Sequence, residues 1–303
     1  MSVKPEKTVS HSGAMITFLE SSFKERFLWD FYFGALRPPK VRGSVQFDDP
    51  ALHHELIGQL KDNSVTVKEF QIDVDDYKAY MEKARYQDFP AYRIAGGGGA
   101  KNFVEKTLEH YMASELLGFG KDDVYIDVGS ADSPAPEIYR KLFGCKSFRQ
   151  DIMFPQGVRG GNIGGDACAM PLKDGFASKI GLHCAFEHFE GNSDVKFVRE
   201  ASRILQVGGK MVILPLYLFK AYAVQTNPAY MPRGGIPFER DAMLYCIRNK
   251  ASRHQRFYDV PHFMSRIIRF SNAFETTVYA FVNKKDVDPS CYLSFAAVFE
   301  KKS

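Results

Sequence analysis

Two carboxylates stand at the ends of short apolar segments, and a turn of small residues lies between them. Asp127 closes the run VYID, Asp151 closes SFRQD, and the turn begins at Gly129. A small-residue turn at a strand end lets backbone amides approach a ligand closely at the start of the next helix. In open parallel sheets a strand-end carboxylate commonly binds ribose hydroxyls. The pattern therefore predicts a nucleoside-binding edge of an α/β sheet.

Histidines supply the candidate proton acceptors, because imidazole exchanges a proton near neutral pH. His188 follows the apolar segment 178–183 within about one turn, with Glu187 beside it, and His262 opens a predicted helix. We predict His188, His262 and Glu187 as catalytic candidates, each with a structural or solvent-exposed role as the alternative. Secondary candidates are His183, His110, Asp259 and Tyr258.

Strands alternate with helices in the middle of the chain, which indicates a parallel sheet with right-handed crossovers. We predict strands at 124–128, 147–151, 162–165, 178–183 and 210–216, with helices at 135–142 and 193–205. After an irregular insertion at 217–260, a helix at 261–270 and two strands at 276–282 and 292–299 close the chain. The polar link NKKDVDPS between these strands suits an antiparallel pair at the sheet edge.

Residues 1–90 precede this pattern and are expected to form a mostly helical extension, with helices at 14–33, 50–61 and 74–86 and a strand near 65–72. Aromatic residues gather between Met15 and Leu36, and Phe23, Phe27 and Phe31 recur at four-residue intervals, as on one helix face. This face can pack on its own domain, contact a membrane or meet a second subunit. Four glycines at 96–99 form a loop that is either a lid or a connector, before a helix at 101–117.

The order and spacing of four segments resemble the class I S-adenosylmethionine-dependent methyltransferase superfamily, in its type 11-like form. These segments are VYIDVGSADSP, GGDACAMPLKDG, KIGLHCAFEHFEG and EASRILQVGGK. The resemblance implies an α/β fold with a seven-stranded, mostly parallel Rossmann-like sheet and helices on both faces. It assigns residues 91–303 to the methyltransferase domain and places the insertion at 217–260 over the acceptor pocket.

The same resemblance implies S-adenosylmethionine as cofactor and places Asp166 and Ala167 at its adenine. The cofactor-binding residues expected are Asp127, Gly129, Ser130, Ala131, Ser133, Asp151, Asp166, Ala167 and His183. In the loop that follows the first strand of this domain, Ala131 and Ser133 stand where the family usually has glycines. We expect either that this loop is displaced or that the Ser133 hydroxyl binds the ligand. Ser178 and Lys179 stand where an acidic residue often opens the fourth strand. No metal is expected, although Glu187, His188 and Asp259 are a conceivable set of ligands.

The expected function is methyl transfer to a small-molecule or glycan-like acceptor, at oxygen. Five arginines of the insertion allow an anionic acceptor: Arg233, Arg240, Arg248, Arg253 and Arg256. A net charge of +4 and the sequence CAFE after the fourth strand disfavour a nucleic-acid acceptor. One alternative is a non-catalytic, methyltransferase-like scaffold protein. The other is an enzyme that acts on a protein or lipid acceptor at a membrane surface. A homo-oligomer is a further expectation for the partners of this chain.

The location expected is cytoplasmic. The five cysteines contain no CxxC pair, the first residues are polar, and no apolar run reaches the roughly 18 residues of a membrane helix. The aromatic segment is the candidate for peripheral membrane contact.

Overall fold

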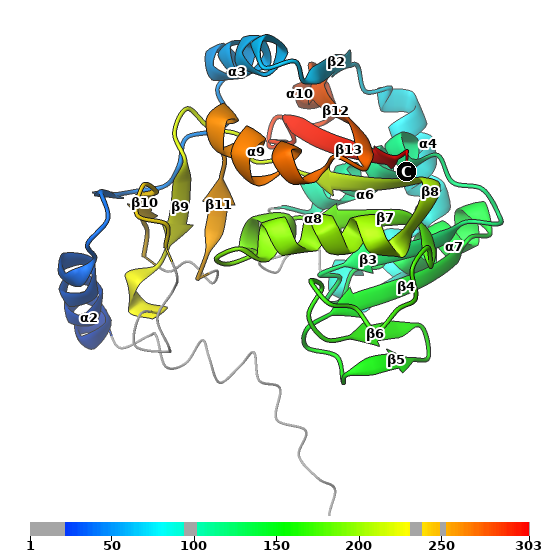
Figure 1. Cartoon of the computed structure of the whole chain (residues 1–303), viewed down its shortest axis with the longest axis horizontal. Coiled ribbons are helices and arrows are strands. Elements are labelled where there is room, and N and C mark those ends of the chain that lie inside the picture. The colour runs from blue at the N-terminus through cyan, green and yellow to red at the C-terminus, as the bar shows by residue number, and fades with distance from the viewer. Residues whose placement is uncertain (1–21, 94–101, 231–237, 249–252, 303) are drawn as a thin grey trace, which may run out of the picture.

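The computed structural model describes residues 22–93, 102–230, 238–248 and 253–302, and these form two sheets (Figure 1). The larger sheet has nine strands in the order β2-β12-β13-β8-β7-β3-β4-β6-β5. Its strands are β2 Thr66–Phe70, β3 Val124–Val128, β4 Lys146–Asp151, β5 Gly157–Arg159, β6 Asn162–Gly164, β7 Ala177–His183, β8 Leu205–Leu214, β12 Phe274–Phe281 and β13 Phe295–Lys301.

The centre of this sheet confirms the predicted α/β architecture. Strands β6, β4, β3, β7 and β8 are mutually parallel, and their spatial order is that of a doubly wound Rossmann sheet. Every residue of β7 is buried, as expected for a central strand covered on both faces.

The prediction of seven strands is wrong for the described residues, because two short strands extend the sheet. β5 pairs with β6 as an antiparallel hairpin, and β2 of the N-terminal extension pairs with β12. The antiparallel pair β12–β13 is confirmed, but it does not form the edge. β13 lies between β8 and β12, and β2 takes the outer position.

Helices cover both faces of the sheet. Adjacent residues of β3 point to opposite sides, so Ile126 shares a core with Phe197 of α8 while Tyr125 shares another with Met112 of α6. The helices are α2 Ser22–Ala35, α3 Pro50–Asp62, α4 Val74–Ala84, α5 Pro90–Arg93, α6 Phe103–Leu117, α7 Ala135–Phe143, α8 Ser193–Ile204, α9 Val260–Arg266 and α10 Lys284–Val287.

The insertion was expected to be irregular, and this is wrong. It contributes β9 Ala223–Thr226, β10 Met243–Cys246 and β11 Gln255–Phe257, which join β1 Lys40–Arg42 in a separate four-stranded sheet. Figure 1 shows this sheet beside the larger one. Each strand has only three or four residues, and β1 pairs with β10 across some 200 positions of sequence, so no local pattern announces the pairing.

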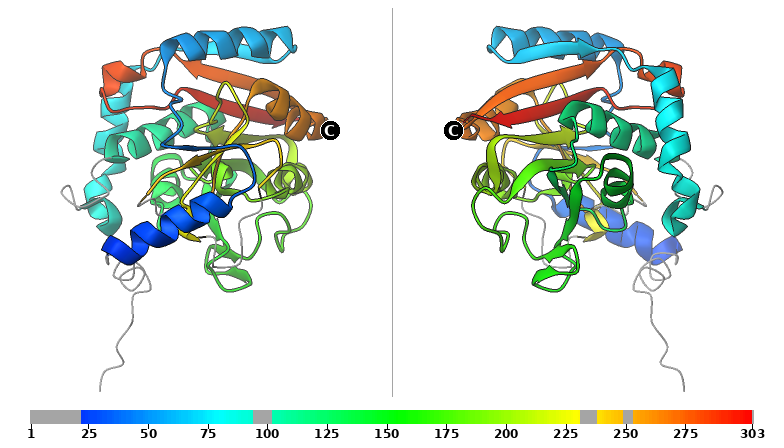
Figure 2. Two further views of the ribbon diagram at one scale, coloured as in Figure 1. Left: turned by 90° about the vertical axis from the view of Figure 1, so that its left-hand side faces the viewer. Right: turned by 90° about the vertical axis from the view of Figure 1, so that its right-hand side faces the viewer.

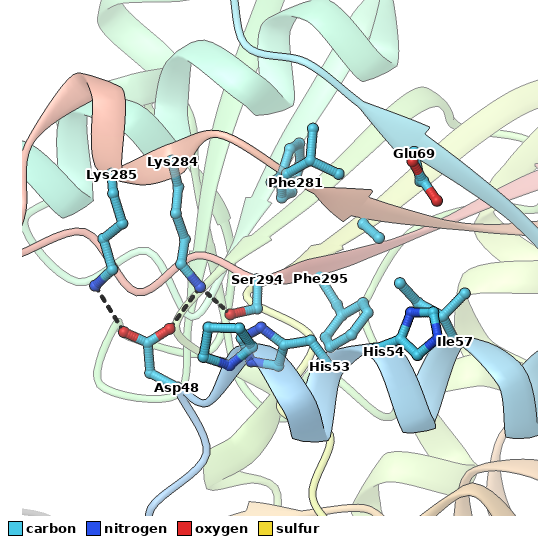
Figure 3. Close-up of a pocket in the computed structure, with 13 residues that line it drawn as sticks. Asp48, His53, His54, Ile57, Glu69, Phe281, Lys284, Lys285, Ser294 and Phe295 are labelled. Carbon is cyan, nitrogen blue, oxygen red and sulfur yellow. Dashed lines mark hydrogen bonds and ion pairs between the residues drawn. The ribbon is translucent and has the colours of Figure 1, made fainter.

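Asp48 anchors the N-terminal extension to the C-terminal strands. Its carboxylate lies 2.6 Å from Lys284 Nζ and 2.7 Å from Lys285 Nζ, and Lys284 also donates to Ser294 (Figure 3). Burial alone would raise the pKa of Asp48, but the two ammonium groups hold it below its ordinary value. The ion pairs lie beside a pocket of about 300 Å³ under α3, which lies above β12 and β13 in Figure 2.

The described part of the aromatic segment is helix α2, and it divides its rings between two environments. Trp29 is buried, stacks on Phe33 and donates its indole N–H to the carbonyl of Ile247. Phe27 and Phe31 are 66% and 60% exposed. The helix therefore packs on its own domain through one face and leaves another open. The side chain of Phe23, residues 15–21, the glycines at 96–99 and Arg233 lie outside the described residues.

Arg256 on β11 connects the small sheet to helix α8, and its loss should destabilise the protein. The guanidinium is fully buried, 3.0 Å from Asp194 of α8 and 2.8 Å from Glu239. Removing one partner of a buried pair leaves charge uncompensated, so Arg256→Met should lower the free energy of unfolding by about 3–5 kcal/mol in urea titrations. Arg85→Met, in the exposed pair with Asp88, is the control and should change little. A loss below about 1 kcal/mol would mean that neighbouring donors compensate.

Candidate functional site

A cleft of about 770 Å³ opens where β3, β4 and β7 end. Predicted residues from four separate segments line it together: Gly129, Asp151, Asp166, Ala167 and His188. This is the carboxyl edge of parallel strands, where doubly wound sheets bind their ligands. Cys184, Phe189, Glu190 and Arg253 line its other side.

The turn after β3 depends on Gly129. Its φ is 65°, and a Cβ there would lie 2.8 Å from the Cβ of Ala185, which follows β7. Only glycine combines this conformation with such a close approach. Ala131 also has a positive φ, 41°, and its amide donates to Asp151 Oδ2 at 2.9 Å. The turn is thus tied to the end of β4.

Ser133 has a local structural role. Its amide donates to the carbonyl of Ser130 at 2.7 Å, and its hydroxyl accepts from the amide of Ala135 at the start of α7. The Ser133 hydroxyl also interacts with Asp127. Burial raises the pKa of Asp127 to about 7, against the opposing effect of the Ser133 and Tyr125 hydroxyls. These contacts give Ser133 a role in shaping the turn. The two expectations for this position, a displaced loop or a hydroxyl that binds the ligand, stay predictions.

Asp127 and Ser130 each keep a buried polar atom without a protein partner. Both residues are at most 5% exposed. Asp127 Oδ2 and Ser130 Oγ form no hydrogen bond with any described residue. Such atoms are uncommon in folded proteins and call for a ligand, an ion or water. Their place at the head of the turn favours a ligand with hydrogen-bond donors.

Asp151 and Asp166 are held by backbone amides. Asp151 Oδ1 accepts from Met153 N–H at 2.9 Å, and Asp166 Oδ1 accepts from Cys168 N–H at 2.8 Å. A carboxylate can accept about four hydrogen bonds, so both retain capacity toward the cleft. Beside them, Ile152 and Met153 are 71% and 84% exposed and present apolar surface to the cleft.

His188, on the 3-10 turn Phe186–His188, has a defined tautomer when neutral. Its Nδ1 lies 2.6 Å from the carbonyl oxygen of His254, which can only accept, so Nδ1 carries a proton. The lone pair then resides on Nε2, 3.6 Å from Glu187 Oε1. His188 lines the cleft, and Glu187 is buried beside its Nε2.

His183 does not line the cleft. It is buried behind the end of β7, with Nε2 3.1 Å from the Tyr125 hydroxyl and 3.8 Å from Asp127 Oδ1. Burial, with the Lys106 ammonium nearby, lowers the pKa of His183 to about 3. His110 packs edge-on against it and is also held neutral by burial. A neutral His183 can orient Asp127 but is not itself placed against a cleft ligand.

His262 lies apart from the cleft-lining residues. Its Nδ1 is 2.6 Å from Asp259, its Nε2 is 3.1 Å from Asp241, and its ring stacks on Tyr222. Asp259 is therefore engaged with His262 rather than with Glu187 and His188. Among the described residues no group of three or more His, Cys, Asp and Glu side chains is arranged to hold a metal ion.

Helix α6 contributes buried charges that sequence reasoning missed. Glu105 and Glu109 of this helix are at most 1% exposed. Lys106 Nζ lies 3.0 Å from Glu109, and Cys184 donates its thiol to Glu109 Oε1 at 3.1 Å. The sequence of α6 did contain a signal for this burial. Its apolar residues are distributed around the whole helix, so no face is left purely polar for solvent.

Three of the described arginines of the insertion are already engaged with carboxylates, whereas Arg240 is exposed. Arg248 pairs with Asp30, Arg253 binds Glu190 through two nitrogens, and Arg256 is buried against Asp194. The expectation of an anionic acceptor rested on free arginine forks, and these three do not supply them. Ser178 and Lys179 also have structural partners, Asp123 and the carbonyl of Leu117.

Comparison with family models and with curated proteins gives no match. Among solved structures, the chain is similar to the 1,6-didemethyltoxoflavin-N1-methyltransferase of Burkholderia thailandensis with bound S-adenosylhomocysteine. The identity is 13%, the TM-score is 0.45, and the match covers 77% of this chain and 92% of that one. A putative methyltransferase complexed with the Haloferax volcanii Trm112 activator matches at 12% identity and TM-score 0.45, over 68% and 95% of the chains.

A third similar structure is phospholethanolamine N-methyltransferase 2 of Haemonchus contortus, with 9% identity, TM-score 0.41 and 75% and 60% of the two chains covered. At such identities and scores these likenesses assign no activity. The Rossmann-like assignment rests instead on strand order and direction. In the described ranges no helix combines the length and apolar character needed to cross a membrane.

The lowered pKa of His183 makes stability depend on pH. Unfolding lets this histidine take up a proton between its ordinary pKa and about 3, so stability falls as pH drops from about 6.5 toward 3. His183→Asn should make the fall in unfolding free energy between pH 6 and 4 shallower by about 1.4 kcal/mol per pH unit, measured in urea at several pH values. His54→Asn, at an exposed position, is the control. An unchanged slope would mean that folded His183 accepts the proton.

Proposed function

We propose that this protein is an S-adenosylmethionine-dependent methyltransferase acting on a small-molecule or glycan-like acceptor, at oxygen. The observation that carries the proposal is the cleft at the carboxyl edge of β3, β4 and β7. It brings the Gly129 turn and Asp151 together with an oriented His188.

The residues that line the cleft, together with those at the end of β3 and in the turn beside it, suit an adenosyl cofactor in their chemistry. The Asp127 and Ser130 atoms that lack protein partners suit the amino-acid part, and Asp151 suits the ribose diol. Asp166 and Ala167 provide a carboxylate and an amide for the adenine edge, and the exposed Ile152 and Met153 offer apolar surface to a flat ring. Bound there, the cofactor would supply an electrophilic methyl group.

The chain's own residues would position the acceptor and remove its proton. His188 keeps Nδ1–H on the His254 carbonyl and offers the Nε2 lone pair to an acceptor hydroxyl. Buried Glu187 lies 3.6 Å from Nε2 and can stabilise the imidazolium that forms. In-line positioning within the cleft contributes the rest of the rate.

A second function remains a candidate because of helix α2. Phe27, Leu28 and Phe31 are exposed on it, as a contact with a membrane surface or a second subunit requires. An acceptor in a protein or lipid, or a scaffold role without catalysis, would use this face. Measurable turnover with a soluble acceptor would favour the first function.

Asp151→Ala should weaken S-adenosylmethionine binding about ten- to a hundredfold in isothermal titration, which is roughly 1.5–3 kcal/mol. The reason is the loss of charge-assisted hydrogen bonds to the ribose. Because Asp151 also holds the amides of Ala131 and Met153, Asp151→Asn is measured beside it, and it should lose less. Asp75→Ala, on the exposed start of α4, is the control. Unchanged affinity in a folded Asp151→Ala protein would remove this residue from the site.

His188→Ala should leave cofactor affinity intact while methyl transfer falls at least about a hundredfold, because removal of a general base costs 10²–10⁴ in rate. The rate of methyl transfer is measured with methyl-labelled S-adenosylmethionine, as the label that appears in an extract containing candidate acceptors. His54→Ala, exposed on α3, is the matched control. Near-wild-type turnover would show that positioning suffices without a base at 188.

A further inference from the structure

A group of buried charges lies directly behind one wall of the cleft. Cys184 and His188 line that wall, and each contacts a buried carboxylate on its far side. Cys184 Sγ lies 3.1 Å from Glu109 Oε1, and His188 Nε2 lies 3.6 Å from Glu187 Oε1. Glu109 and Glu187 are 0% and 4% exposed, so water screens them little.

The positive groups around these carboxylates do not balance them. Lys106, 3.0 Å from Glu109, is the ammonium paired with them in the described structure. Glu187 Oε2 has no hydrogen-bond partner among the described residues. The nearby rings of His110 and His183 are held neutral by burial. Burial raises the pKa of Glu109, and the Lys106 ammonium opposes this shift. With both carboxylates ionised, the described side chains behind this wall carry more negative than positive charge.

A buried negative excess has a consequence for any ligand of the adjacent cleft. The potential of charges in a low-dielectric wall extends into the cleft and favours a cation there. This wall is in contact with the turn at Gly129. Gly129 packs closely against Ala185, the residue that follows Cys184 in the sequence. The wall therefore borders the turn proposed to bind the amino-acid part of the cofactor, to which the sulfonium is joined.

We propose, on the basis of the proposed function, that Glu187 and Glu109 make this cleft select the sulfonium form of the cofactor over the uncharged thioether product. In the transfer, the acceptor oxygen bonds to the methyl carbon, the carbon–sulfur bond breaks with its electron pair left on sulfur, and His188 takes the proton. Sulfur thereby loses its positive charge. The attraction exerted by the two carboxylates is lost at the same moment, which promotes release of the product.

The proposal assigns opposite effects to residues of one cluster. Removing the Glu187 charge should weaken the preference for the sulfonium, and removing the Lys106 charge should strengthen it. A purely structural role predicts a different result, in which each substitution weakens both ligands by the same factor. The ratio of two dissociation constants therefore tests the charge effect separately from any damage to the fold.

The experiment measures Kd for S-adenosylmethionine, S-adenosylhomocysteine and 5′-methylthioadenosine by isothermal titration. For the wild-type chain we expect S-adenosylmethionine to bind about tenfold more tightly than S-adenosylhomocysteine, the effect of roughly one poorly screened charge. Glu187→Gln should reduce this ratio at least about threefold, and Lys106→Gln should raise it by a similar factor. Glu109→Gln is a second charge removal, and Glu137→Gln, on exposed α7, is the matched control.

A wild-type ratio near one, or a ratio unchanged in both Glu187→Gln and Lys106→Gln, would overturn the proposal while leaving the cofactor assignment intact. If none of the three adenosyl compounds binds the wild-type chain, the proposed function itself fails and this inference fails with it. Circular dichroism and the affinity for 5′-methylthioadenosine, which lacks the amino-acid part, report whether each variant retains the cleft.

Discussion

The contact between the turn after β3 and the turn after β7 determines the shape of the cleft. At Gly129 the backbone comes so close to Ala185 that any side chain would collide with it. Because the two strands are neighbours in the parallel sheet, this contact sets the separation of their carboxyl ends. Asp151 secures the same turn from the third strand through the amide of Ala131. Without this close packing, the groups proposed to bind a cofactor would not face one cavity.

The small second sheet positions the other side of the cleft. Arg256 on β11 donates to the carbonyls of Phe189 and Gly191, the first of which belongs to a cleft-lining residue. His254, just before β11, accepts the hydrogen bond that fixes His188. The insertion therefore orients the proposed base through its backbone, and its Arg253 lines the cleft.

The buried ionisable groups indicate a balance between stability and function. Burial raises the pKa of Glu105 to about 8 and that of Asp127 to about 7, so ionising either group in the folded chain has a free-energy cost. Burial of such groups without full pairing opposes folding. Asp127 lies at the end of β3, just before the turn that borders the cleft, and a strongly shifted pKa at such a place is typical of a functional site.

How far the sequence determined this protein depends on the range of the interactions. The central strands, the Gly129 turn and Asp151 follow from local patterns, since buried parallel strands are short apolar runs and their turns need small residues. Locally similar histidines could not be separated, because the packing of distant elements places His188 in the cleft, His183 behind it and His262 elsewhere. The pairing of β1 with β10 was decided only by tertiary structure. So was the burial of charges on α6, because a helix's own sequence does not specify what will cover it.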